Sequence, residues 1–299
     1  MKEKTRRTIA NCLLLLAGAI WGGGFVVMKN ALDNISTNYL LAIRFAIGAL
    51  GLCYTLFSKK TPVNKYALLG GAVTGGCLYG AFAVQTYGLM YTTAGKNALI
   101  TAFYVVLVPF ILWMRRRERP DARVMVAAVM MLTGIALLSL NGGEGMNIGD
   151  FLTLLCGIGY ALHIIYVDKF EQRVDVMQLT CLQFAFASAY AWIAALLFEQ
   201  PPAHFGPETI GALAYCGVAG TLIALTLQNV GIKYASPEYA SLFMSTEAAF
   251  GCIFGVVFLN ETMTGRMTVG CILILCALAL SQVDWGAVMA KKREEKNEV

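Results

Sequence analysis

The sequence has few charged residues and few residues suited to catalysis. Only 14% of its 299 residues are Asp, Glu, Lys or Arg, whereas soluble domains carry about a quarter. It has two histidines, and its nine cysteines form no CxxC pair. These absences argue against a soluble enzyme, a zinc site and a disulfide framework. The chain also contains no Walker motif, so we expect no ATP-driven step within it.

Apolar residues dominate instead. They make up 58% of the chain, and the mean hydropathy is +0.65. A membrane-spanning helix needs about 20 mostly apolar residues, and the apolar segments are too long and too uniform for barrel strands. The sequence therefore predicts an all-α membrane protein of ten transmembrane helices. The expected ranges are Thr8–Met28, Asn38–Phe57, Tyr66–Tyr87, Lys96–Met114, Val124–Leu140, Ile148–Val167, Val176–Phe198, Ile210–Ile232, Tyr239–Leu259 and Met267–Trp285.

The basic residues predict an orientation. With the N-terminus in the cytoplasm, all but four of the 23 Lys and Arg residues fall on the cytoplasmic side. The exceptions are Lys29, Lys96 and Arg266 on the outer side, and Arg44 within the second helix. This bias predicts that both termini are cytoplasmic. The apolar run at Thr8–Met28 is long enough to span and no clear small-residue cleavage site follows it, so we expect an uncleaved first helix. We expect a multi-pass protein of a bacterial cytoplasmic membrane, with the lipid bilayer and no nucleic acid as a partner.

The two halves of the chain resemble each other. Five helices is an odd number, so a second copy enters the membrane from the opposite side. We therefore expect inverted five-helix repeats at residues 1–143 and 144–290, followed by a charged cytoplasmic tail at 291–299. Inverted repeats are a recurrent design of transporters, with the substrate site near the midplane. An offset of 143 pairs Gln85 with Gln228, Gly88 with Gly231, Tyr91 with Tyr234, Leu99 with Leu242, Glu118 with Glu261 and Arg123 with Arg266.

Three stretches resemble the EamA type of the drug/metabolite transporter superfamily. They are AIWGGGFVVMK at 19–29, YTTAGKNALITAFYVVLVP at 91–109, and STEAAFG through FLNET within 245–262. The resemblance covers nearly the whole chain and implies a ten-helix carrier for amino acids, other metabolites or drugs, frequently an exporter, with no cofactor. The usual Leu-Gly-Glu at the end of the ninth helix is Leu-Asn-Glu here, at 259–261.

Glu247 is the strongest candidate for a functional residue. It lies about nine residues into the ninth expected helix, roughly 13 Å deep at 1.5 Å per residue. A carboxylate near the midplane is costly unless it is paired, protonated or in contact with water. It can couple transport to protons or bind a substrate amine, or it can be a structural carboxyl group bonded to a neighbouring helix. Its counterpart in the first repeat is Tyr104, which we expect to face it.

Other polar side chains in the expected helices allow two interpretations each. Arg44 can extend towards the outer surface or bond to a backbone carbonyl group, or it can hold a substrate carboxylate. Gln85 and Gln228 can bind a polar substrate or link helices, and the same choice applies to Gln183 and His163.

Residues nearer the helix ends and the aromatic residues of the first helix also allow two interpretations. We expect Lys96 to be solvated at the outer interface, and Glu118 and Glu261 to cap or pack helix ends. Trp21 and Phe25 are four residues apart on one helix face. They form either an aromatic cavity wall or a packing surface.

These observations predict a secondary carrier. A small organic solute, such as an amino acid or a related amphipathic metabolite, would bind between the repeats and be exported by alternating access. Protons are the candidate coupling ion, and one chain with both repeats predicts a monomer. The alternatives are a broad drug exporter or a nucleotide-sugar carrier and, from other classes, a lipid-modifying membrane enzyme or a non-transporting sensor. We expect no metal and no catalytic residues.

Overall fold

The structure is a computed structural model of the whole chain, and it describes residues 3–57, 62–117, 122–139, 146–202, 205–235, 237–244 and 246–282. Within these ranges every regular element is helical. The elements are α1 (Glu3–Ala31), α2 (Thr37–Leu52), η1 (Cys53–Phe57), α3 (Lys65–Tyr91), α4 (Ala94–Thr101), α5 (Tyr104–Arg116), α6 (Ala122–Ser139), α7 (Ile148–Glu171), α8 (Val176–Phe198), α9 (Pro207–Ala214), η2 (Tyr215–Ile223), α10 (Ala224–Tyr234), α11 (Pro237–Met244), α12 (Thr246–Leu259) and α13 (Gly265–Gln282).

Helices occupy each of the ten ranges expected from hydropathy. Seven helical stretches of the described chain are long and apolar enough to cross a membrane, and three more apolar helices are shorter. The range expected at Lys96–Met114 is divided into α4 and α5, because a turn at Ala102 and Phe103 interrupts the helix. The end of the last expected helix, at Trp285, and the tail at 291–299 lie outside the described residues.

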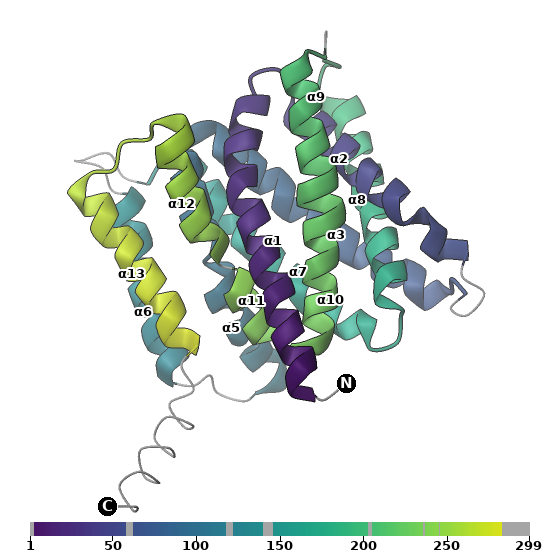
Figure 1. Cartoon of the computed structure of the whole chain (residues 1–299), viewed down its shortest axis with the longest axis horizontal. Helices are drawn as coiled ribbons and strands as arrows, with labels where there is room; N and C mark the ends of the chain where they lie inside the picture. The colour runs from purple at the N-terminus through teal and green to yellow at the C-terminus, as the bar shows by residue number, and fades with distance from the viewer. Residues whose placement is uncertain are drawn as a thin grey trace, which may run out of the picture.

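Helices of the first half pack mainly on helices of the second half. The most extensive pairings are α3 with α7 and α8, α2 with α8, α6 with α13, and α1 with α12 and α10. Figure 1 shows α6 and α13 side by side at one flank and α2 near α8 at the other, with α1 between them. Glycine allows the closest approach. A Cβ atom on Gly22 of α1 would overlap the Phe250 side chain of α12, and one on Gly75 of α3 would lie 2.6 Å from the Gln183 carbonyl oxygen of α8.

The outer surface carries large apolar side chains. Leu50, Leu196 and Phe198 are 72%, 69% and 81% exposed, and many other aliphatic residues are similarly open. Water would make so much exposed apolar surface unfavourable, at roughly 25 cal/mol per Å². Hydrocarbon would not, so this surface fits the interior of a bilayer.

Carboxylates from the second half cap two helices of the first half. At α2 the Glu199 carboxylate accepts hydrogen bonds from the Asn38 and Tyr39 backbone N–H groups at 3.0 and 3.2 Å. At α4 the Glu261 carboxylate accepts from the Ala94 and Gly95 N–H groups at 2.6 and 3.0 Å. A carboxylate there satisfies free donors and complements the helix dipole. The capping role predicted for Glu261 is therefore confirmed, although it caps a helix far away in sequence.

Two lysines close to these helix caps bind other groups of the protein. Lys29 Nζ donates to the Leu89 and Thr92 carbonyl oxygens at 2.7 and 2.9 Å. Lys96 is only 6% exposed, and its Nζ lies 3.8 Å from Oδ2 of Asp150, which is fully buried. The expectation that Lys96 is solvated at the interface is thus wrong. The sequence did not show that the acidic first turn of α7 would pack against the start of α4.

Candidate functional site

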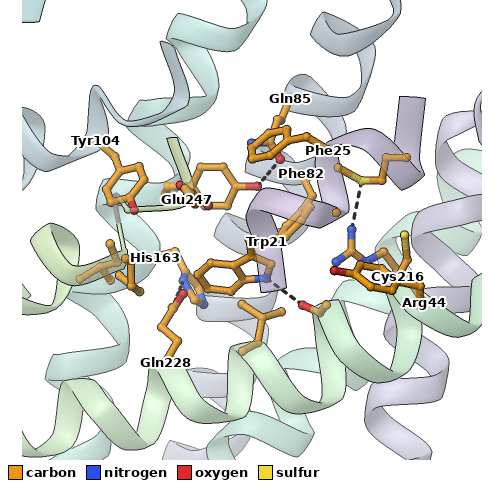
Figure 2. A pocket seen from close by; sticks show the side chains of 18 residues that line it. Trp21, Phe25, Arg44, Phe82, Gln85, Tyr104, His163, Cys216, Gln228 and Glu247 are labelled. Carbon is orange, nitrogen blue, oxygen red and sulfur yellow. Dashed lines mark hydrogen bonds between the residues drawn. The ribbon is translucent and has the colours of Figure 1, made fainter. Parts of the chain in front are cut away.

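A buried cavity lies where the two halves meet, and eight of the nine predicted site residues line it. Its side chains come from α1, α2, α3 and α5 of the first half and from α7, η2 and α10–α12 of the second. Figure 2 shows them converging on a common space. The lining residues are Trp21, Gly24, Phe25, Met28, Arg44, Phe82, Gln85, Tyr104, Tyr160, His163, Ile164, Tyr215, Cys216, Gly220, Leu225, Gln228, Met244 and Glu247.

Among the described residues of this lining, Glu247 supplies the only carboxyl group. It lies in the first turn of α12, where the helix dipole favours negative charge. Its side chain is 6% exposed, and it interacts with the Tyr104 hydroxyl group at the start of α5. Among the described residues it forms no ion pair with Lys or Arg. A buried carboxyl group without a cation is available for a proton or for a cationic group of a ligand.

Arg44 supplies the only Lys or Arg side chain among the lining residues that the structure describes. It is 2% exposed, and its Nε donates to the Thr221 hydroxyl group at 2.9 Å. Its Nη1 lies 3.4 Å from the Met28 sulfur atom, and its Cζ lies 4.4 Å above the Phe82 ring. The absence of a Cβ atom at Gly220 leaves room for the guanidinium group, because such an atom would lie 3.3 Å from Nη2.

Neither of the two structural contacts expected for Arg44, with the outer surface or with a backbone carbonyl group, is found among the described residues. The side chain does not extend to the surface, and its described partners are a hydroxyl group, a thioether and aromatic rings rather than a backbone carbonyl group. No carboxylate of the described residues pairs with it. Uncharged partners hold the guanidinium group in place without neutralising it, so it can receive an anionic group of a ligand. In Figure 2, Arg44 and Glu247 lie on opposite sides of Trp21.

The predicted glutamine of the first half connects helices and also lines the cavity. Gln85 Nε2 donates to the Thr101 hydroxyl group of α4 at 3.0 Å, and Gln85 Oε1 accepts from the Tyr160 hydroxyl group of α7 at 2.7 Å. Both roles considered for Gln85 are therefore geometrically compatible. The contact also fixes Tyr160, whose ring packs against Phe82 and Tyr104.

Three polar residues of the second half form a chain of hydrogen bonds. His163 Nε2 lies 3.1 Å from Gln183 Oε1, and His163 Nδ1 lies 3.3 Å from Gln228 Nε2. Because an amide oxygen only accepts and an amide nitrogen only donates, the imidazole carries its hydrogen on Nε2. Gln183 does not line the cavity. It lies behind His163 and orients the ring, so the predicted direct contact of Gln183 with a substrate is not supported.

Trp21 and η2 form the wall between the two charged groups. η2 is a nine-residue π-helix, a rare form that is frequent at functional sites. Trp21 Nε1 donates to the Gly220 carbonyl oxygen at 2.9 Å, and the Tyr215 hydroxyl group donates to the Ile20 carbonyl oxygen at 2.8 Å. Trp21 and Phe25 thus belong to the cavity wall, as one of the two interpretations proposed.

The cavity is narrow in this conformation. About 40 Å³ is open to the centres of water molecules, which is room for roughly three waters. A larger solute therefore enters only when the lining helices separate. Around this space lie one carboxyl group, one guanidinium group, amide groups and several aromatic faces. This set can recognise a small molecule with a polar or charged end and an apolar body.

Comparison with known proteins identifies the family. The sequence profile of the EamA-like transporter family matches residues 8–140 and, again, residues 147–282. The chain belongs to the EamA-like transporter family. This membership, together with the seven long apolar stretches, makes it an integral multi-pass membrane protein. The family resemblance seen in the sequence is therefore confirmed.

Relatives of this EamA-like transporter cover almost its full length. An uncharacterized transporter of Archaeoglobus fulgidus is 30% identical, over 93% of this chain and 87% of that protein. A probable amino-acid metabolite efflux pump of Salmonella typhimurium is 23% identical, over 90% of this chain and 93% of that protein. A solved crystal structure shares the fold, with a TM-score of 0.71 at 18% identity and 95% and 98% of the two chains covered.

Several residues of the transporter's cavity were missed by sequence reasoning. Tyr160, Tyr215 and Phe82 are ordinary residues of apolar helices, and nothing in the sequence distinguishes them from packing residues. Thr221 holds Arg44, but a threonine in an apolar run most often bonds to its own helix.

Proposed function

We propose that this transporter is a secondary carrier that moves a small organic solute, an amino acid or a related amphipathic metabolite, outward across a bacterial cytoplasmic membrane. Ten helices, arranged as inverted repeats at 1–143 and 144–290, would open the cavity alternately to either side, with both termini in the cytoplasm. The two separate matches of one family profile support the repeats. The name of the Salmonella relative supports the solute class and the direction.

The strongest support for this carrier function comes from the charged groups of the cavity. The cavity between the halves holds a buried carboxyl group and a buried guanidinium group, and neither forms an ion pair with a described residue. Unpaired buried charges are costly, and a solute that carries a complementary group would offset that cost. The amino group of such a solute would bind at Glu247 and its carboxylate at Arg44, with Trp21, Phe25 and Tyr104 around its apolar part.

We propose protons as the coupling ion and Glu247 as the group that carries them. Tyr104 and Glu247 interact, and the carboxyl group lies inside the cavity. A single carboxyl group that binds either a proton or the solute's amino group couples the two movements, because one occupant excludes the other. A monomer suffices in this scheme, since one chain supplies all the lining residues.

The alternative cargoes fit less well. A nucleotide sugar carries phosphate groups, for which several arginines are the usual partners. Here Arg44 is the single basic residue of the lining, and Lys96 is paired with Asp150. A broad drug exporter would use the same aromatic walls but would not need Arg44.

Solute flux into proteoliposomes tests the proposal. We expect one or more amino acids or related solutes from a broad panel to be transported, and an imposed pH gradient to change their accumulation several-fold. Glu247→Gln keeps the shape of the side chain but cannot exchange a proton, so its flux should not respond to the gradient.

Glu208→Gln is the matched control, since Glu208 is an exposed glutamate in the first turn of α9, and it should behave like the wild type. Absence of flux across the whole panel would refute the carrier. An unchanged pH response in Glu247→Gln would refute the coupling role.

A further inference from the structure

Four sulfur-bearing side chains gather between α12 and α13, away from the central cavity. Cys252 Sγ lies 3.6 Å from Met263 Sδ and 3.9 Å from Cys271 Sγ. Met267 lies one helical turn before Cys271 on α13 and lines the same small cavity as Cys252 and Met263. We call Cys252, Met263, Met267 and Cys271 the sulfur cluster.

The sulfur cluster does not follow from the internal repeat. At the offset of 143, the first-half residues are Pro109, Pro120, Val124 and Ala128. None of them contains sulfur, so helix packing at this place does not require it. The cluster is therefore a feature of the second half alone.

The spacing of the sulfur atoms suits a shared metal ion. With metal–sulfur bonds of ~2.3 Å, the length seen for zinc thiolates, two sulfur atoms on one ion lie about 3.8–4.0 Å apart. The distances of 3.6 and 3.9 Å need little adjustment. The adjoining cavity has about 10 Å³ open to the centre of a water molecule, which is space for a single small occupant.

The chemistry of the ligands selects the kind of ion. Thiol and thioether sulfur atoms are soft ligands that favour Cu⁺ over hard cations. The described residues hold no group of three His, Cys, Asp or Glu side chains that would suit other metals. Cys252, Met267 and Cys271 are 8–9% exposed, so net charge is costly there. One thiolate neutralises a univalent ion and two would neutralise a divalent ion, so the two thioether ligands, which favour soft Cu⁺, decide between them.

We propose that the sulfur cluster binds one soft univalent metal ion, Cu⁺ or Ag⁺. One cysteine binds the ion as a thiolate and releases its proton to solvent, and the other binds as a neutral thiol, so the occupied site carries no net charge. The half-buried Met263, on the connection that leads to α13, gives the ion a route in from the surface. The same connection carries Glu261, which caps α4. A bound ion would therefore fasten the segment that joins the two halves at this end.

Ag⁺ binding to the purified, fully reduced chain in detergent tests this proposal, because Ag⁺ does not change its oxidation state. A soluble monothiol in excess, which competes for Ag⁺ with single cysteine side chains, should leave one ion bound per chain. The double variants Cys252→Ala/Cys271→Ala and Met263→Leu/Met267→Leu should each bind it at least ten-fold more weakly. Cys12→Ser/Cys276→Ser, which changes two exposed cysteines, should bind it like the wild type.

A second measurement uses the wild-type chain and does not depend on how variants fold. Bound Ag⁺ should slow the alkylation of Cys252 and Cys271 at least ten-fold, as measured by peptide mass spectrometry, and leave Cys12 and Cys276 unprotected. Equal protection of all cysteines, or full binding by either double variant, would overturn the proposed site.

Discussion

At the scale of single residues, opposite charges determine what the cavity can recognise. Glu247 and Arg44 both line it, and uncharged groups hold each of them. If the two side chains formed an ion pair, they would neutralise each other and neither charge would attract a solute. Their separate placement, with Trp21 between them in Figure 2, therefore favours a solute with charge at both ends.

Replacement of Arg44 by lysine tests this recognition. Arg44→Lys keeps the positive charge but loses the Nε hydrogen bond to Thr221 and the flat face over Phe82. A hydrogen bond to a charged group contributes about 1.5–3 kcal/mol, so we expect the KM for a carboxylate-bearing solute to rise roughly 10- to 100-fold. Initial rates of uptake give this value. Arg266→Lys, at an exposed arginine, is the control, and an equal effect in both variants would contradict a specific role.

The sequence could reveal the charged members of the site but not their partners. Glu247 and Arg44 stand out in the sequence because a charged side chain inside an apolar helix is energetically costly. The sequence could not place the Arg44 side chain, since the depth of a residue along a helix does not tell which face it occupies. Tyr160 and Phe82 carry no such signal, because tyrosine and phenylalanine pack equally well against lipid.

At the scale of elements, η2 is a place where the two halves differ. The residues that correspond to it at the offset of 143 lie within α3, which is regular α-helix. In η2 the Thr221 hydroxyl group donates to the Cys216 carbonyl oxygen at 2.8 Å and accepts from Arg44. Hydrophobicity alone could not predict this, since π-helical and α-helical spans have the same composition. Side chains of α1 and α2 help to hold the π form.

Thr221→Val should weaken η2 and release Arg44. The variant has the same shape but offers no hydroxyl group, so the Nε hydrogen of Arg44 loses its acceptor. We expect a loss of about 1–3 kcal/mol in stability, seen as a lower Tm in detergent, and weaker binding of any solute that needs Arg44. Thr133→Val is a suitable control, because the Thr133 hydroxyl group bonds only to its own helix on an exposed face. Equal shifts in Tm would count against the special role of Thr221.

Glycines that look alike in the sequence should respond oppositely to alanine. A Cβ atom at Gly22 would overlap Phe250, whereas one at Gly80 would meet nothing within 4 Å. Gly22→Ala should therefore destabilise the chain by about 1–3 kcal/mol, and Gly80→Ala should be neutral or stabilising by up to ~1 kcal/mol. Thermal denaturation of both variants in the same detergent measures the difference. A destabilising Gly80→Ala variant would show that small residues matter there for another reason.

At the scale of the whole molecule, the end at which α1 finishes is held by polar contacts between the halves. Glu199 caps α2, Glu261 caps α4, and Asp150 receives the Thr92 hydroxyl hydrogen at 2.7 Å. Alternating access requires such contacts to break and re-form at one end.

The sequence predicted the helices and their order well, because hydropathy is local. It could not predict these contacts, which depend on which helices become neighbours.

Glu261→Gln should loosen this end of the transporter. The neutral amide accepts weaker hydrogen bonds from α4, and the loss of about 1–2 kcal/mol corresponds to a 5- to 30-fold change in the population of an open state. In a variant that retains Cys216 as its single cysteine, a membrane-impermeant thiol reagent applied from this side should label Cys216 faster by that factor. Glu208→Gln in the same background should leave the rate unchanged. A slower rate in Glu261→Gln would show that the cap does not keep this end closed.

The caps and cavity bonds also bear on how the chain is made. During synthesis, α1–α6 enter the membrane before the second half. They carry the polar side chains of Arg44, Gln85 and Asn97 and the free N–H groups of α2 and α4. Their described partners Thr221, Tyr160, Thr153, Glu199 and Glu261 emerge from the ribosome only later. Until then these polar groups need water, lipid headgroups or the insertion machinery as hydrogen-bond partners. The second half therefore supplies the partners that the polar groups of the first half lack while the chain is being made.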